Sequence, residues 1–230
     1  MLHRNPSHQH RGFTLVELLT VIAIIAIMGG IIGLSFSGGG SMAALGSSQR
    51  LATSTFQLAR LTAQSKQSEA KVLIYAEQNP AGDTDPAKYL RYMMVVYRDS
   101  ASNRWVAAGE GTYLPKGVYF LPAGTDLTAT LTGTFKRSTG YDNFTDNIYP
   151  NLDAAQANRG AFNFDALAYT YDSRGLCQSP GEQVVLSVGE ISGYAADGVP
   201  PLTFENNNAL VGFYLRRTGG VVMAESGDLQ

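Results

Sequence analysis

The chain has 230 residues, of which 44% are hydrophobic and 16% are charged, so it is long enough to bury one sizeable hydrophobic core. Its formal net charge is −2 at pH 7, and it has no polybasic tail of the kind that binds nucleic acid or anionic lipid. All three histidines lie in the first eleven residues, and Cys177 is the only cysteine. The rest of the chain therefore cannot form a Ser-His-Asp triad, a histidine-ligated metal site or an intramolecular disulfide.

Residues 13–36 form an apolar segment in which Glu17 is the only charged residue. As a helix with a rise of ~1.5 Å per residue, the segment would be about 36 Å long, enough to cross a hydrocarbon core of ~30 Å. Residues 1–12 contain Arg4 and Arg11 and no acid. The positive-inside rule therefore predicts that 1–12 lie in the cytoplasm and that the chain after the segment lies across the membrane.

Two common interpretations, a secretory signal and a signal anchor, each explain only part of this segment. A secretory signal would have a shorter apolar region, followed by a cleavage site of small residues. A signal anchor explains the length and the basic flank, but it does not explain Glu17. A carboxylate at the centre of a bilayer costs roughly 2.5 kcal/mol or more, so an acid retained there usually has a specific partner.

The sequence HRGFTLVELL at 10–19 resembles the leader junction of type IV prepilins and type II secretion pseudopilins, and the resemblance continues through TVIAIIAI at 20–27. It implies that a prepilin peptidase cleaves between Gly12 and Phe13 and that the new terminus at Phe13 is N-methylated. Glu17 would then be the fifth residue of the mature chain, where this family carries a glutamate that pairs with the amino terminus of a neighbouring subunit.

The next two segments complete the long N-terminal spine that this resemblance implies. Residues 37–46 are a glycine-rich joint, and SGGGS at 37–41 predicts a kink or a melted stretch because each interior glycine weakens a helix by roughly 1 kcal/mol. The joint would serve close helix packing in the membrane, reorientation of the head, or both. Residues 47–71 predict an amphipathic helix, with one apolar face at helical spacing. That face comprises Ala52, Phe56, Ala59, Ala63 and Ala70, widened by Leu51, Leu58 and Leu61.

Residues 72–230 predict a β-rich head, so the fold class is α+β: the pilin fold, with an antiparallel β head, in two sheets, packed on the helix. Residues 134–162 have the least pattern and are expected to form a long surface loop. The predicted strands are 72–76, 89–98, 104–108, 117–121, 127–133, 166–171, 183–188, 209–216 and 221–224.

A second resemblance concerns the head. The segments at 55–77, 114–120 and 214–225 are similar to the corresponding parts of the GspH/FimT-like minor pseudopilins and pilins. These matches are short and scattered, and 134–162 lies outside them.

Two features of the head resemble ligand sites. Asp142 and Asp146, with Asn143, Asn147 and Asp153, offer oxygen ligands for calcium, as do Asp83 and Asp85, but no calcium motif is present and solvated loop acids are expected. Arg216 and Arg217 lie at the predicted tip of the last hairpin, and the resemblance to FimT-like pilins raises DNA binding there. Two arginines in an acidic body favour a solvated turn, so nucleic acid is not the expected partner.

The aromatic residues offer a third feature, because they alternate with polar residues. They would line either a sugar-binding face or the core, and core packing is the better interpretation. They are Tyr92, Tyr97, Trp105, Tyr113, Tyr119 and Phe120.

The sequence therefore predicts a non-enzymatic filament subunit without a cofactor: a minor pseudopilin or pilin of a type II secretion system or type IV pilus. Its expected partners are the prepilin peptidase and methyltransferase, other pilins or pseudopilins, and inner-membrane lipid. It would be a single-pass protein of the inner membrane, with a periplasmic head that is incorporated into the filament. The alternative is a binding pilin for DNA or cargo on the same scaffold; a membrane-anchored enzyme is least favoured.

Overall fold

The computed structural model describes residues 15–77, 87–123, 136–150, 160–191, 202–204, 209–224 and 226–229; within 15–41 it describes the backbone and the side chains of Leu19 and Ile22. The chain divides into two compact units, Met1–Gly40 and Ser41–Gln230. The second unit contains all the described strands and is called the head below.

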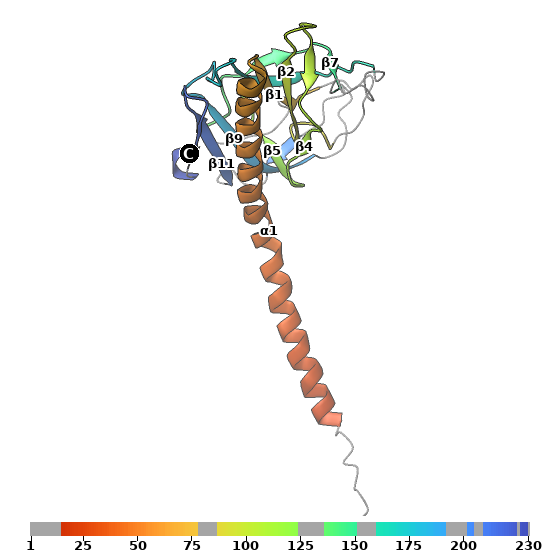
Figure 1. Ribbon diagram of the computed structural model, residues 1–230. Coiled ribbons are helices and arrows are strands. Elements are labelled where there is room, and N and C mark those ends of the chain that lie inside the picture. Colours follow the sequence, from red (N-terminus) through yellow and green to blue (C-terminus); the bar gives the residue numbers. More distant parts are fainter. Residues whose placement is uncertain are drawn as a thin grey trace, which may run out of the picture. The chain divides into compact units, whose positions relative to one another are not determined.

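A single helix, α1, runs from Leu15 to Lys66 (Figure 1). Its backbone is helical without interruption through 37–46, so the melted stretch predicted there is not observed. The physical reason is cooperativity: adding a glycine to an existing helix costs about 1 kcal/mol, whereas restarting a helix requires a new and unfavourable nucleus.

The helix ends earlier than the sequence predicts, at Lys66 instead of residue 71. Gln67 has a left-handed backbone, with φ 48°, and its N–H donates to the carbonyl of Gln64 at 3.3 Å. The Ser68 N–H donates to the carbonyl of Ala63 at 3.1 Å. These two bonds form a Schellman cap. Ala70, predicted on the helix face, is instead the first residue of a strand.

The larger sheet has seven strands, in the order β6-β8-β1-β2-β3-β7, with β4 also paired to β2. Every pair is antiparallel except β3 with β7, which is parallel. The strands are β1 Ala70–Tyr75, β2 Tyr92–Arg98, β3 Trp105–Ala107, β4 Thr112–Tyr113, β6 Asp142–Phe144, β7 Ile148–Tyr149 and β8 Ala166–Tyr171.

The smaller sheet has five strands, in the order β10-β9-β11-β12, with β5 also paired to β9. All of its pairs are antiparallel. A short 3-10 helix, η1 Ser226–Leu229, follows the last strand. The strands are β5 Val118–Phe120, β9 Gln183–Ile191, β10 Leu202–Phe204, β11 Leu210–Leu215 and β12 Val221–Ala224. The predicted two-sheet head is thus confirmed.

The main core forms where residues 41–66 of α1 pack against both sheets. Phe56 is fully buried, with its ring centroid 5.1 Å from that of Tyr169 on β8 and 5.0 Å from that of Phe213 on β11. Ala52, Ala59 and Ala63 lie in the same core, so the predicted small-residue face is the packing face. Leu58 and Leu61, predicted to widen this face, are instead exposed. Small side chains allow the strands to approach the helix closely.

Strand β1 is buried on both of its faces. Val72 and Ile74 point into the main core, whereas Leu73 and Tyr75 point into a second core on the opposite face, as the period of two requires. Phe144 and Ile148 help to form that second core. The expectation that 134–162 is a surface loop is therefore wrong for its described residues, because β6 and β7 form the two edges of the larger sheet and bury Phe144 and Ile148 in the second core.

Candidate functional site

The N-terminal segment is the first candidate. Gly12, Phe13 and the side chain of Glu17 lie outside the described part, but the backbone at Glu17 belongs to the first turn of α1.

Two apolar side chains of the same segment are described. Leu19 is 61% exposed and Ile22 is 58% exposed, and their spacing of three residues places them on one face of the helix. Apolar surface of this kind favours burial in lipid or against another helix. Among the residues that the structure describes, no helix combines the length and the apolarity that crossing a bilayer requires.

The acidic candidates do not converge in the described part of the head. Asp142 is exposed on β6, and the Asp146 carboxylate accepts a hydrogen bond from the indole N–H of Trp105 at 3.1 Å. Asp83, Asp85 and Asp153 lie outside the described residues. Within the described ranges no group of three or more His, Cys, Asp or Glu side chains could hold a metal ion.

The arginine candidates lie where the sequence places them. Arg216 and Arg217 are exposed in the turn between β11 and β12. The carbonyl of Arg217 accepts a hydrogen bond from the N–H of Cys177 at 3.2 Å, so this turn contacts the turn that follows β8. Sequence spacing does not reveal that contact, because the two turns are about forty residues apart.

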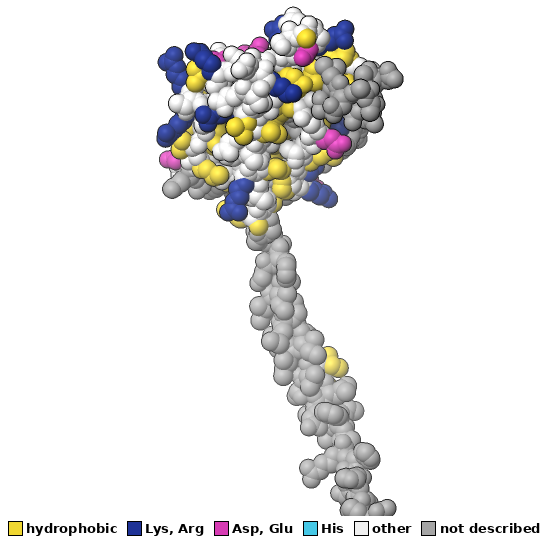
Figure 2. All heavy atoms as spheres, in the orientation of Figure 1, with side chains coloured by type: hydrophobic (Ala, Val, Ile, Leu, Met, Phe, Trp, Pro, Cys, Tyr) yellow, Lys and Arg dark blue, Asp and Glu magenta, His cyan; other side chains and the backbone are white. Residues whose placement is uncertain are grey.

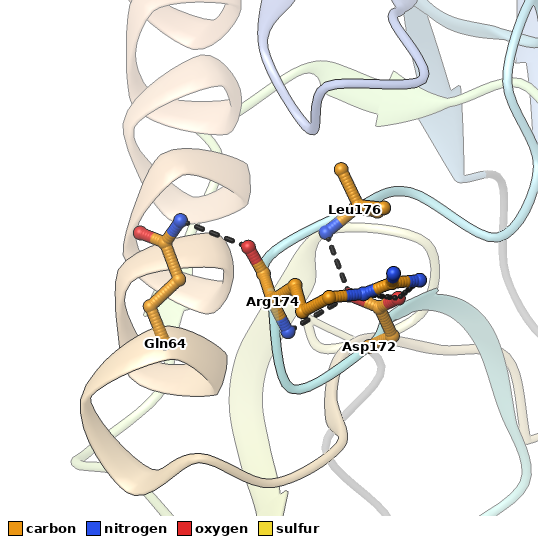
Figure 3. Close-up of polar contacts among 4 residues, drawn as sticks. All are labelled: Gln64, Asp172, Arg174 and Leu176. Atoms are coloured by element: carbon orange, nitrogen blue, oxygen red, sulfur yellow. Dashed lines mark hydrogen bonds and ion pairs between the residues drawn. The ribbon is translucent and has the colours of Figure 1, made fainter.

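The β8 turn adds a third exposed arginine. Arg174 pairs with Asp172 at 2.9 Å, and its backbone carbonyl accepts a hydrogen bond from the side-chain amide of Gln64 on α1 at 3.0 Å (Figure 3). The Asp172 carboxylate also accepts hydrogen bonds from the backbone N–H groups of Leu176 and Arg174. These contacts hold the pKa of Asp172 below its usual value, the Leu176 N–H contributing most.

Arg60 of α1 lies next to the same two turns. Its side-chain carbons would meet a Cβ placed at Gly219, and its buried Nε has no hydrogen-bond partner in the described part of the chain. We call Arg60, Arg174, Arg216 and Arg217 the arginine pole. Lys and Arg side chains also gather at the upper left of the head in Figure 2.

Cys177 is buried at the base of the arginine pole. Burial raises the pKa of its thiol, which keeps it protonated at neutral pH. A protonated, buried thiol is a weak nucleophile, so this cysteine is expected to be unreactive.

The predicted core role of the aromatic residues holds for four of the six. Tyr97, Trp105, Tyr119 and Phe120 are buried. Tyr113 is exposed and Tyr92 is half-buried.

The comparisons with known proteins agree with the N-terminal prediction. Residues 7–33 match the family described as "Prokaryotic N-terminal methylation motif". This is the signal of a type IV pilin-like or pseudopilin-like precursor, and it implies processing by a prepilin peptidase and assembly with other pilins. No curated protein and no solved structure is significantly similar to the chain.

Proposed function

We propose that this protein is a minor pseudopilin or minor pilin, a structural subunit of the filament of a type II secretion system or a type IV pilus. The observation that carries the proposal is the methylation motif at 7–33, which contains the Gly12–Phe13 junction and Glu17, the only charge between 13 and 36. An α+β chain with a long N-terminal helix suits this role. The short head segments similar to GspH/FimT-like proteins favour that subgroup.

Residues 13–36 would anchor the precursor in the inner membrane, with 1–12 in the cytoplasm and the head in the periplasm. The apolar composition and the basic flank support this topology. The exposed Leu19 and Ile22 would be buried first by lipid and then by neighbouring helices as the filament assembles.

Glu17 would guide that assembly through its charge. Cleavage after Gly12 exposes an amine at Phe13, which is cationic at neutral pH because an α-amino group has a pKa of ~8, and methylation keeps the charge. In low dielectric the attraction between this cation and the Glu17 carboxylate of a neighbouring subunit is strong. The pairing removes the penalty for an isolated carboxylate at membrane depth. Nothing in this role requires catalysis or a cofactor.

The test is incorporation into filaments in the native host. Glu17→Ala should leave processing intact but lower the amount of the protein that co-purifies with the major subunit, by about tenfold or more if roughly 1.4 kcal/mol of pairing is lost. Glu17→Asp keeps the charge and serves as the matched control. Gly12→Val should block cleavage, which mass spectrometry would detect as retention of residues 1–12.

Two results would contradict the proposal. One is a mature N-terminus other than Phe13, for example after the apolar segment. The other is normal incorporation of the Glu17→Ala variant, which would show that assembly does not depend on the pairing of Glu17. The prediction of cleavage after Gly12 would then be judged separately, from the processing experiment.

A binding role for the head, toward DNA or a secreted cargo, is the second candidate. The arginine pole favours it, because the fold adds Arg60 and Arg174 to the two arginines of the hairpin turn, and three of the four are exposed. Phosphate binding by such a group should be strongly salt-dependent.

A gel-shift titration of the purified protein with duplex DNA at two salt concentrations tests this candidate. Arg216→Ala/Arg217→Ala should weaken binding, and Lys136→Ala, a basic residue outside the pole, is the control. The absence of any shift with the parent protein at low salt would exclude DNA as the ligand.

A further inference from the structure

A groove of about 610 Å³ lies beside β4, on the head. This volume is in the range of small-molecule sites in proteins, ~300–1,000 Å³. The residues that line the groove come from two stretches of the chain, 88–113 and 150–162. Its walls include Lys88, Tyr92, Glu110, Tyr113, Pro150 and Phe162.

Exposed aromatic rings are concentrated at this groove. Tyr113 is 42% exposed and Phe162 is 41% exposed, and they are the only aromatic side chains among the large exposed hydrophobic residues of the described chain. Both line the groove. Isolated exposed rings are common on protein surfaces, but two that converge on one concave site favour a ligand.

The aromatic wall is held by the fold. Tyr92 and Tyr113 are directly paired between β2 and β4, with ring centroids 5.0 Å apart. The phenol of Tyr92 occupies the space that a Cβ at position 111 would need, so Gly111 allows the ring to lie flat against the backbone. The burial that results raises the pKa of Tyr92.

Phe162 is fixed from the other side of the groove. Its backbone N–H and carbonyl exchange hydrogen bonds with Ile148, of 2.9 and 2.8 Å. Its ring stacks on that of Phe164, with 6.4 Å between centroids and 16° between planes, and Phe164 in turn contacts Tyr92 at 6.3 Å. The rings therefore form a preorganised surface.

The charges in the groove indicate the kind of ligand. The Lys88 ammonium lies 5.8 Å from the centroid of Tyr92, in the position where a cationic ligand would bind the ring. Glu110, on the same wall, would repel an anion. Among the described residues that line the groove, one cation and one carboxylate balance, which favours a neutral ligand that has both apolar faces and hydroxyl groups.

We propose that this groove binds a neutral carbohydrate chain. Tyr113 and Phe162 would stack against the C–H faces of successive sugar rings, while Glu110 and Lys88 would form hydrogen bonds with sugar hydroxyls. The sequence alone favours core packing for Tyr92 and Tyr113 and gives no signal for Phe162, because residues 134–162 have no clear pattern. The proposal is independent of filament assembly, since every residue involved belongs to the head.

The experiment is calorimetric titration of the full-length protein, in detergent, with cellohexaose, chitohexaose and maltohexaose. At least one of them should bind, and Tyr113→Ala and Phe162→Ala should each weaken that binding by about tenfold, the worth of one aromatic contact. Tyr113→Phe keeps the ring and should stay within about twofold of the parent. Met223→Ala, which removes a half-exposed apolar side chain from β12, is the control and should leave binding unchanged.

Several outcomes would overturn the proposal. These are no heat with any of the three sugars, equal binding by the parent and Tyr113→Ala, or binding of decaproline or tetramethylammonium in place of a sugar. The last two probes represent a proline-rich peptide and a cation, the other ligands that an aromatic wall accommodates. Circular dichroism of each variant separates loss of binding from loss of folding.

Discussion

Gly219 allows the turn between β11 and β12 to pack closely against the turn that follows β8. It has a φ of 78°, and a Cβ at this position would overlap the carbonyl oxygen of Gly175. Gly219→Ala should therefore lower the free energy of unfolding by on the order of 3 kcal/mol, through backbone strain and a steric clash. Urea denaturation followed by the fluorescence of Trp105, the single tryptophan, measures this loss.

Gly181 is the matched control for that experiment. Its φ is 88°, but no heavy atom lies within 4 Å of a Cβ placed there. Gly181→Ala should lose only about 1 kcal/mol, from backbone strain. Equal losses in the two variants would contradict the close contact between the turns.

Asp172 gives the β8 turn a defined pH dependence. Its pKa is lower in the folded protein than in the unfolded chain, so its contribution to stability is present above the unfolded value of ~3.9 and is lost as the pH falls through the folded value. Asp172→Asn should thus lower the melting temperature at pH 7, and the difference from the parent should disappear as the pH falls well below ~3.9. Melting curves over this range check the expectation. A difference that persists unchanged in acid would mean that the carboxylate charge has no role in the turn.

At the scale of elements, one side chain of α1 contacts both sheets. Phe56 contacts Tyr169 of the larger sheet and Phe213 of the smaller, so Phe56→Ala should cost ~3–5 kcal/mol. Leu58, two residues along the same helix, is 52% exposed, and Leu58→Ala should change stability by no more than ~0.5 kcal/mol. Urea denaturation of both variants tests the predicted helix face. Similar losses would show that this face is misassigned.

Elements with enough residues to show a period were predictable. The helical spacing of Ala52, Phe56 and Ala59 identifies the packing face of α1, and the strand predictions at 166–171 and 221–224 match β8 and β12. The strands β4, β6, β7 and β10 have two or three residues each, too few for alternation to appear. Their positions depend on pairing with distant strands, and the predicted strand 127–133 lies outside the described residues.

The candidate sites also differ in whether local sequence is enough to predict them. Placing Arg216 and Arg217 at a hairpin tip needs only local sequence, and the structure confirms their position. Arg174 belongs to the arginine pole, and Phe162 belongs to the groove beside β4, because of contacts between distant parts of the chain. A sequence taken alone does not reveal such contacts. The methylation motif is the opposite case, because a peptidase reads it as sequence and its signal is wholly local.

At the scale of the whole molecule, the buried core and the apolar segment 13–36 occupy different stretches of chain. All the buried hydrophobic residues described lie between Leu45 and Leu229, within the unit Ser41–Gln230. A chain that starts at Ser41 should therefore fold cooperatively and keep the urea midpoint of the full-length protein, as reported by Trp105. It should also stay in solution without detergent, because it lacks the apolar segment 13–36. A clearly lower midpoint, or a broad transition without cooperativity, would mean that residues 1–40 contribute to the stability of the head, and the head would then not be a self-sufficient folding unit.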